Sequence, residues 1–361
     1  MEKKDYGRVL EIDFFRFVFS VVIAFFHTEY LLGKSVLFPG GAFCVEFFFL
    51  VSGYLMMASL EKIRGRKIEN LGLETARFLG KKAAAIYPEF ALAFLIGLVV
   101  QSVFCALPWE KIGQLAMSSS FELLLLQRTG IGENGVDGVI WYVQSMLLCM
   151  AILYPLIRKY PEVMRWIVLP LTALLLLGYI YRNFTHVRAP SKWLGLTYKG
   201  NLRAMAELSL GAECYFVTQY LRRFTLKKTA AILLTILKWF CWVLVCIYMW
   251  EREWKQDMFM LALMCVAVVL AFSRQCVDER LFQNKTVAFL GKLSLPLYLC
   301  HIFYAKYLPE VLPEEMRYRY RLVCYTVCWV LTSLLVMYLA GVIRKKLPSL
   351  KAAMQRCFLV Q

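Results

Sequence analysis

Long hydrophobic stretches separated by short, mostly basic segments run along the whole chain. A helix that crosses the hydrocarbon core of a bilayer needs about 20 apolar residues, and most of these stretches approach that length. The pattern therefore predicts an all-α, polytopic integral membrane protein with about ten transmembrane helices. The sixth stretch carries one of the two weakest signals, because Arg203, Glu207 and Glu213 interrupt it; the eighth carries the other. We place the helices at residues 12–32, 42–60, 83–106, 139–157, 166–182, 203–220, 229–250, 257–273, 286–304 and 322–343.

Composition supports a lipid environment. The chain has 361 residues, of which 60% are hydrophobic, more than the interior of a soluble domain absorbs. Its formal charge of +17 is carried by basic residues bunched between hydrophobic stretches, which is typical of topology signals and not of nucleic-acid binding. The 12 cysteines lie mainly in apolar segments without a CxxC pair, so we expect no disulfide framework and no metal site.

The domain organisation is simple. The first hydrophobic stretch is longer than the apolar region of a typical signal peptide and lacks a small-residue cleavage site, so we expect it to remain as the first helix. We find no internal repeat and no polar region long enough to fold by itself. Residues 1–361 are therefore expected to form a single transmembrane domain without a fused soluble domain.

The distribution of basic residues predicts the orientation. Basic residues in short loops are retained on the cytoplasmic side of the membrane. With the N-terminus inside, about 26 of the 42 lysines and arginines fall in inner segments, against about 13 in outer loops. The outer stretch 107–138 is acidic, which favours the same answer. We therefore expect both termini to be cytoplasmic.

The first predicted helix carries Arg16 and His27. Ionisable groups are rare and costly in a membrane, so both are candidates for a functional site. Eleven residues at about 100° each return to within roughly 20° of the starting direction, which places both side chains on one face, roughly 16 Å apart. Arg16 would lie near the inner end and His27 near the outer end. The alternative is that Arg16 reaches the headgroups and His27 binds a neighbouring carbonyl.

Two further ionisable residues are expected near His27. Glu46 begins the second predicted helix, where its carboxylate would orient or stabilise the imidazole. His301 lies in the ninth predicted helix, near the same outer face, and the chain has only three histidines. Ser52 and Gly53 also allow a purely structural interpretation, because small residues let helices pack closely.

Three short motifs follow one another along the chain: Asp13, Arg16 and His27; then Phe48, Phe49, Ser52, Gly53 and Tyr54; then Ser294, Tyr298, Leu299 and His301. In type, spacing and order they resemble the motifs of the bacterial acyltransferase 3 family of membrane-bound O-acyltransferases. The resemblance extends over nearly the whole chain and includes the expected number of helices.

Two segments depart from the common pattern of that family. The helix that begins at Trp141 has Met146 where a glutamate is frequent, which leaves Gln144 and Ser145 as its polar groups. The basic run before the third helix has Ala85 where an arginine is usual. Donor binding there would depend on neighbouring lysines instead.

The resemblance implies an O-acyltransferase of the cytoplasmic membrane of a bacterium. Such an enzyme moves an acyl group, usually acetyl, from cytoplasmic acyl coenzyme A to a hydroxyl of a surface polysaccharide, a lipid or another envelope acceptor. Coenzyme A is then a donor substrate and not a permanently bound cofactor. Cations at the inner side suit its nucleotide diphosphate through charge-assisted bonds. The donor-binding candidates are Arg16, Arg77, Lys81 and Lys82. The catalytic candidates are His27, Glu46 and His301, and the substrate-binding candidates are Ser52, Tyr54, Trp141, Gln144, Arg203 and Tyr298.

His27 is expected to act as general base on the acceptor hydroxyl or as a transient acyl carrier. The oxyanion would be stabilised by His301, Tyr298 or Arg203. Arg203 and Glu207, four residues apart, can instead simply pair. A transporter or flippase for an envelope precursor is the alternative function, because buried charges among many helices also occur in carriers. A non-catalytic envelope scaffold is a third reading.

Overall fold

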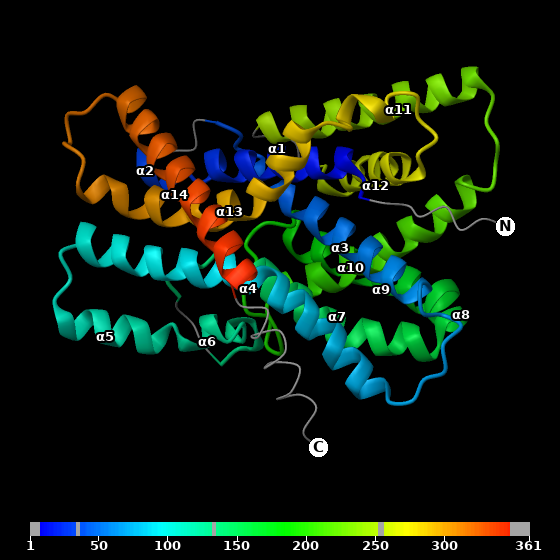
Figure 1. Cartoon of the computed structure of the whole chain (residues 1–361), viewed down its shortest axis with the longest axis horizontal. Coiled ribbons are helices and arrows are strands. Elements are labelled where there is room, and N and C mark those ends of the chain that lie inside the picture. Colours follow the sequence, from blue (N-terminus) through cyan, green and yellow to red (C-terminus); the bar gives the residue numbers. More distant parts are fainter. Residues whose placement is uncertain (1–7, 34–36, 132–134, 252–255, 347–361) are drawn as a thin grey trace.

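The computed structural model describes residues 8–33, 37–131, 135–251 and 256–346, and its regular secondary structure is helical. Figure 1 shows the long helices packed together, some nearly parallel and others, such as α14 (Tyr318–Lys346), oblique to their neighbours. Shorter helices and single helical turns lie between the long helices. The shorter helices are α2 (Glu29–Leu32), α5 (Trp109–Ser118), α6 (Ser120–Leu123) and α8 (Pro161–Val163). The long helices are α1 (Leu10–Phe26), α3 (Cys44–Glu61), α4 (Leu71–Phe104), α7 (Trp141–Lys159), α9 (Leu169–Phe184), α10 (Lys199–Leu221), α11 (Lys228–Trp250), α12 (Asp257–Ser273), α13 (Lys285–Tyr307) and α14 (Tyr318–Lys346).

Seven helical segments of the described chain are long and apolar enough to cross a membrane. The all-α, multi-pass prediction is therefore confirmed, whereas the number of about ten and the orientation of the termini stay predictions. Helices α1 and α12 have 17 residues each, and α10 carries several buried charges. The seven segments are Gly41–Glu61, Leu71–Phe104, Trp141–Lys159, Pro161–Phe184, Lys228–Trp250, Lys285–Glu310 and Tyr318–Lys346.

Helix α4 is longer than the predicted segment 83–106. It has 34 residues and begins at Leu71, because the side chain of Asn70 accepts a hydrogen bond from the backbone N–H of Leu73 at 2.9 Å. At about 1.5 Å per residue the helix is roughly 51 Å long, more than the hydrocarbon core requires. Arg77, Lys81 and Lys82 therefore lie on a helical extension.

Helices α1 and α13 run parallel, side by side. Asp13, near the start of α1, faces Gly291 near the start of α13, and His27 meets His301 beyond the end of α1. Helix α14 packs against this pair and donates a hydrogen bond to each of the two helices. The Tyr325 hydroxyl donates to the carbonyl of Ala24 at 2.9 Å, and the Trp329 indole donates to that of Leu297 at 2.8 Å.

Helices α3 and α10 also run parallel and approach each other at two glycines. A Cβ atom on Gly53 would collide with the carbonyl of Leu208, and one on Gly211 would collide with that of Leu50. Close packing through small residues, the structural interpretation of Gly53, is therefore correct. This contact places the start of α3 beside the start of α10.

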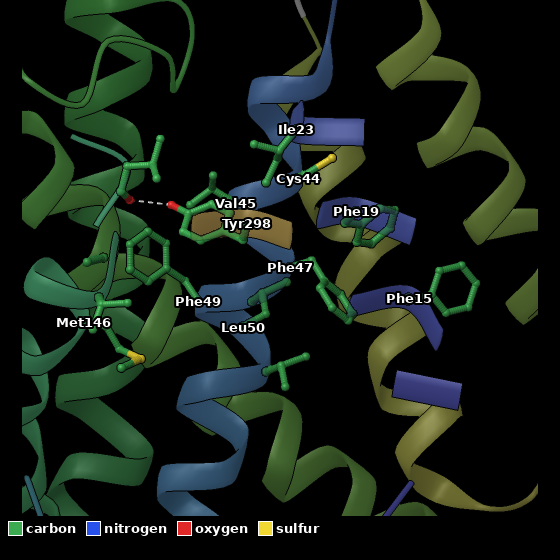
Figure 2. Packing of buried hydrophobic residues seen from close by; sticks show 14 of the residues in the cluster. Phe15, Phe19, Ile23, Cys44, Val45, Phe47, Phe49, Leu50, Met146 and Tyr298 are labelled. Atoms are coloured by element: carbon green, nitrogen blue, oxygen red, sulfur yellow. Dashed lines mark hydrogen bonds between the residues drawn. The ribbon is translucent and has the colours of Figure 1, made fainter. Parts of the chain in front are cut away.

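An aromatic layer joins α1 to its neighbours. Phe15 stacks on Trp242 of α11 with ring centroids 3.9 Å apart, and Phe19 meets Phe47 of α3 at 4.9 Å. Figure 2 shows Phe19 and Phe47 facing each other across this layer. Beside it, the buried ammonium of Lys238 bonds the carboxylates of Glu11 at 2.7 Å and Asp278 at 2.9 Å. The helix that carries His27 is thus held by both apolar and ionic contacts.

Candidate active site

The site is centred on two histidines that are 274 residues apart in sequence. Nε2 of His301 lies 3.3 Å from Nδ1 of His27, and their ring centroids are 5.0 Å apart. His301 is fully buried, whereas His27 is partly exposed. The structure therefore brings together the histidines of the first and last sequence motifs.

Two carbonyls determine which ring nitrogens carry protons. Nδ1 of His27 lies 2.9 Å from the carbonyl oxygen of Ile23, and Nδ1 of His301 lies 2.7 Å from that of Tyr298. A carbonyl only accepts, so each Nδ1 is the donor. In the neutral rings, the single Nδ1–H of His27 is shared between the Ile23 carbonyl and Nε2 of His301, and Nε2 of His27 keeps its lone pair. Such a nitrogen suits a general base, with His301 stabilising the positive ring that forms.

Glu46 lies with Arg203 instead of His27. Its carboxylate pairs with the Arg203 guanidinium, which also lies 3.3 Å from Glu207. All three side chains are almost completely buried, and no hydrogen bond in the described structure joins Glu46 to His27. The expected pairing of Arg203 with Glu207 occurs, but as part of a group of three. One oxygen of each carboxylate has no hydrogen-bond partner among the described residues.

The other polar candidates lie on α3 and α7. The Ser52 hydroxyl is 2.8 Å from that of Tyr142, which donates to the carbonyl of Phe48 at 3.0 Å. Trp141 is buried beneath the Arg203 guanidinium, 5.7 Å from its ring centroid. Gln144 is also buried, and neither its amide nitrogen nor its amide oxygen has a partner in the described structure.

Two tyrosine candidates are committed to contacts inside the protein. Tyr54 stacks on Phe272 of α12 with ring centroids 3.7 Å apart and is buried, so it packs α3 against α12. Tyr298 donates its hydroxyl hydrogen to the carbonyl of Val139 at 2.6 Å, the dashed line of Figure 2. Tyr298 also lies between the histidine pair and Tyr142, 6.0 Å from His301 and 6.2 Å from Tyr142 by ring centroid.

The donor-binding candidates are only partly gathered. Arg16 lies 3.6 Å from Asp13, and Lys82 is near enough for its charge to interact with that of Arg16. Arg77 and Lys81 are exposed on α4. We call the Arg16 and Lys82 side of the bundle the cation end, and the side of His27 and His301 the histidine end.

An arginine from α14 reaches the position where the family pattern lacks one. Arg344 donates to the carbonyl of Ala85 at 2.7 Å and pairs with the carboxylate of Glu89. The sequence pattern pointed to lysines 81 and 82 as substitutes at this position. A guanidinium at Ala85 from a residue 259 positions later could not be found from local spacing.

Two residues near His27 were missed from the sequence. The Tyr30 ring is parallel to that of His27, with centroids 6.0 Å apart, and the ammonium of Lys306 lies 5.7 Å from the Tyr30 centroid. The charge of Lys306 also acts on both imidazoles. Five residues at about 100° each put Lys306 roughly 140° around α13 from His301, so spacing along the helix did not mark it.

Two buried carboxyl groups face Lys306 from the segment between α4 and α7. Glu122 accepts hydrogen bonds from the backbone N–H groups of Gly138 at 2.7 Å and Asp137 at 3.3 Å. Neither carboxylate oxygen of Asp137 has a hydrogen-bond partner in the described structure. Burial raises the pKa of Glu122, and burial together with the nearby Glu122 raises the pKa of Asp137 well above its ordinary value. The charge of Lys306 opposes both shifts.

Comparison with known proteins identifies the family. The family model of an acyltransferase domain, of the acyltransferase 3 type, matches residues 9–342, which include all three sequence motifs. No curated protein and no solved structure matches the chain. The match covers almost the entire chain and confirms the resemblance, so the protein belongs to the acyltransferase 3 family and is a membrane acyltransferase.

Proposed function

We propose that this protein transfers an acetyl group from cytoplasmic acetyl coenzyme A to a hydroxyl of an envelope molecule: a surface polysaccharide, a lipid or another acceptor. The proposal places it in the cytoplasmic membrane of a bacterium with the cation end inside. The observation that carries it is the hydrogen-bonded contact of His27 with His301, which leaves Nε2 of His27 as a basic nitrogen.

The proposed reaction uses that nitrogen. Nε2 of His27 accepts the proton of the acceptor hydroxyl while the hydroxyl oxygen bonds to the thioester carbon. The electron pair of the carbonyl double bond moves to the carbonyl oxygen. The tetrahedral intermediate then collapses as the carbon–sulfur bond breaks. The leaving thiolate takes the proton from the imidazolium. His301 supports the first step because its Nε2 accepts from the Nδ1–H of His27 and stabilises the charged ring.

The depth of the cations supports a donor that enters from the opposite end. Arg16 and His27 are eleven residues apart on one face, roughly 16 Å along the axis. The pantetheine arm of coenzyme A has a comparable extended length. Acetyl coenzyme A whose nucleotide diphosphate is bound near Arg16 and Lys82 would present its thioester to His27.

The acceptor side is supported by polar atoms left without partners. One oxygen each of Glu46 and Glu207 and both amide atoms of Gln144 are buried without a described hydrogen bond. Buried polar groups are normally satisfied, so these atoms are available to the hydroxyl groups of a polar ligand. We propose that they bind the acceptor.

The test is thioester cleavage by the purified protein in lipid with acetyl coenzyme A. We expect free thiol from the wild type and from His186→Ala, and at least about 100-fold less from His27→Ala, the range expected for loss of general-base catalysis. His186 is a matched control because it is an exposed histidine in the loop after α9. Equal rates in both variants would refute the role of His27. No cleavage by folded wild type with any of several acyl donors would favour a transporter.

A further inference from the structure

An acyl transfer that passes through an oxyanion requires a donor or cation that is free to meet it. The candidates from the sequence were His301, Tyr298 and Arg203. In the neutral pair, His301 presents a lone pair to His27, and Tyr298 donates its only hydroxyl hydrogen to Val139. Arg203 is paired with two carboxylates. None of the three is free for this role.

Lys306, in contrast to these three residues, has hydrogen-bond donors that are not occupied by another described residue. No hydrogen bond or ion pair within 4.0 Å to its ammonium occurs in the described structure, and the side chain is only partly exposed. It lies over the Tyr30 ring that is stacked on His27, and its charge acts on the imidazoles of both His27 and His301. Three N–H groups are therefore available beside the proposed base.

Glu122 explains how a cation persists there. It is almost completely buried and lies within electrostatic range of Lys306. A buried ammonium is favoured by nearby negative charge. Because Glu122 uses its oxygens on backbone N–H groups, it attracts the ammonium without occupying its hydrogens. The arrangement holds the charge of Lys306 and leaves its donors free.

We infer that Lys306 is a catalytic residue that stabilises the oxyanion of the tetrahedral intermediate, with Glu122 as its positioning residue. The inference rests on the proposed acyl transfer. When the acceptor oxygen bonds to the thioester carbon, the carbonyl oxygen becomes negative and accepts a hydrogen bond from the Lys306 ammonium. The bond is released when the carbonyl reforms and the thiolate leaves, so Lys306 transfers no proton.

The experiment compares Lys306→Met, Lys306→Gln and Lys306→Arg with Lys292→Met in lipid. Lys292 is an exposed lysine on the same helix and is the matched control. For Met and Gln we expect kcat to fall about 100- to 1,000-fold, the usual effect of losing one oxyanion donor. We expect KM for acetyl coenzyme A, and the Kd of a non-reactive thioether analogue, to change less than about threefold. The proposed hydrogen bond from Lys306 forms to the oxyanion of the tetrahedral intermediate and not to the bound thioester. Lys306→Arg should recover part of kcat, and Lys292→Met should match wild type.

Other outcomes separate the two proposals. If His27→Ala is inactive while Lys306→Met keeps kcat within about threefold, the role of Lys306 is wrong and the proposed function stands. If Lys306→Met and Lys306→Gln lose binding of the thioether analogue, or lose the folded state, Lys306 is a donor-binding or structural residue and the inference is overturned. Wild type without acyl transfer refutes the proposed function itself.

Discussion

At the scale of single residues, the site is built from side chains whose neighbours restrict what they can do. A backbone carbonyl fixes the proton of each histidine on Nδ1 and thereby assigns different tasks to two identical rings. Carboxylates occupy Arg203, and a carbonyl occupies the hydroxyl of Tyr298. The free nitrogen of His27 is what remains for chemistry.

His301 gives a prediction on kcat. In His301→Ala, Nδ1–H of His27 keeps the Ile23 carbonyl but loses the acceptor that supports its charged form. We expect kcat to fall about 10- to 100-fold, less than for a residue that transfers the proton. His301→Gln, which keeps an acceptor oxygen, should retain more activity than alanine. Steady-state thioester cleavage measures this, and equal loss in both variants would contradict it.

Asp137 gives a prediction on stability. Its pKa is raised well above 3.8 by burial and by Glu122, while Lys306 opposes the shift and Tyr298 lies nearby. The folded chain therefore keeps a proton that the unfolded chain releases, so stability falls as pH rises from about 4 through the raised pKa. Asp137→Asn removes this loss. We expect it to raise the free energy of unfolding at pH 8 by about 1–3 kcal/mol, with a smaller gain toward pH 4.

Thermal unfolding in detergent at pH 5 and pH 8 measures the effect of Asp137→Asn. Glu110→Gln is the control, because Glu110 is an exposed carboxylate on α5 and its replacement should change Tm little at either pH. A lower Tm for Asp137→Asn at pH 8 would mean that the carboxylate stabilises the fold through Lys306.

At the scale of helices, two neighbouring helices approach each other closely where glycines lie at their contact. Gly53 and Gly211 let α3 and α10 meet with each glycine against the other helix's backbone. The carboxylate of Glu46 reaches Arg203 only because these two helices start side by side. The glycine contact therefore belongs to the site as much as to the packing.

Gly53→Ala tests that contact. The added methyl would meet the Leu208 carbonyl, which cannot rotate away, so we expect a loss of about 1–3 kcal/mol in stability. Gly80→Ala on α4 is the matched control, since a Cβ there meets nothing within 4 Å. It should be neutral or stabilise the helix by up to about 1 kcal/mol. Thermal unfolding of the two variants gives the comparison, and equal Tm values would refute the prediction.

The sequence predicted elements well where hydrophobic length dominates and less well elsewhere. Segments such as 229–250 and 257–273 agree closely with α11 and α12. The start of α4 was placed at 83 because hydropathy does not register a polar helical extension capped by Asn70. Helices α5 and α6 were not predicted, since the polar stretch 107–138 has no membrane-length pattern.

At the scale of the whole molecule, the first and last sequence motifs meet because the helices that carry them are parallel neighbours. The parallel pair α1 and α13 brings His27 to His301, which the motifs and the predicted topology anticipated. Glu46 at Arg203, Arg344 at Ala85 and Lys306 beside Tyr30 required knowledge of which helices are neighbours. Spacing along one helix carries no information on such contacts between helices.

Orientation is a prediction at this scale. With both termini inside, green fluorescent protein fused after residue 361 should fluoresce, and alkaline phosphatase fused there should be inactive. Alkaline phosphatase inserted after Glu110, in the acidic stretch of the histidine end, should be active. The opposite pattern would invert the proposed direction of transfer, with the donor entering at the histidine end.

The separation of the two histidines by 274 residues also has a consequence for biosynthesis. At translation rates of about 5–20 residues per second, the partner of His27 leaves the ribosome roughly 15–55 s after His27 does. The parallel neighbour of α1 is the second-last long helix of the described residues, which end at 346. We therefore expect a nascent or prematurely terminated chain to lack the histidine pair and, under the proposed mechanism, to be unable to consume thioester.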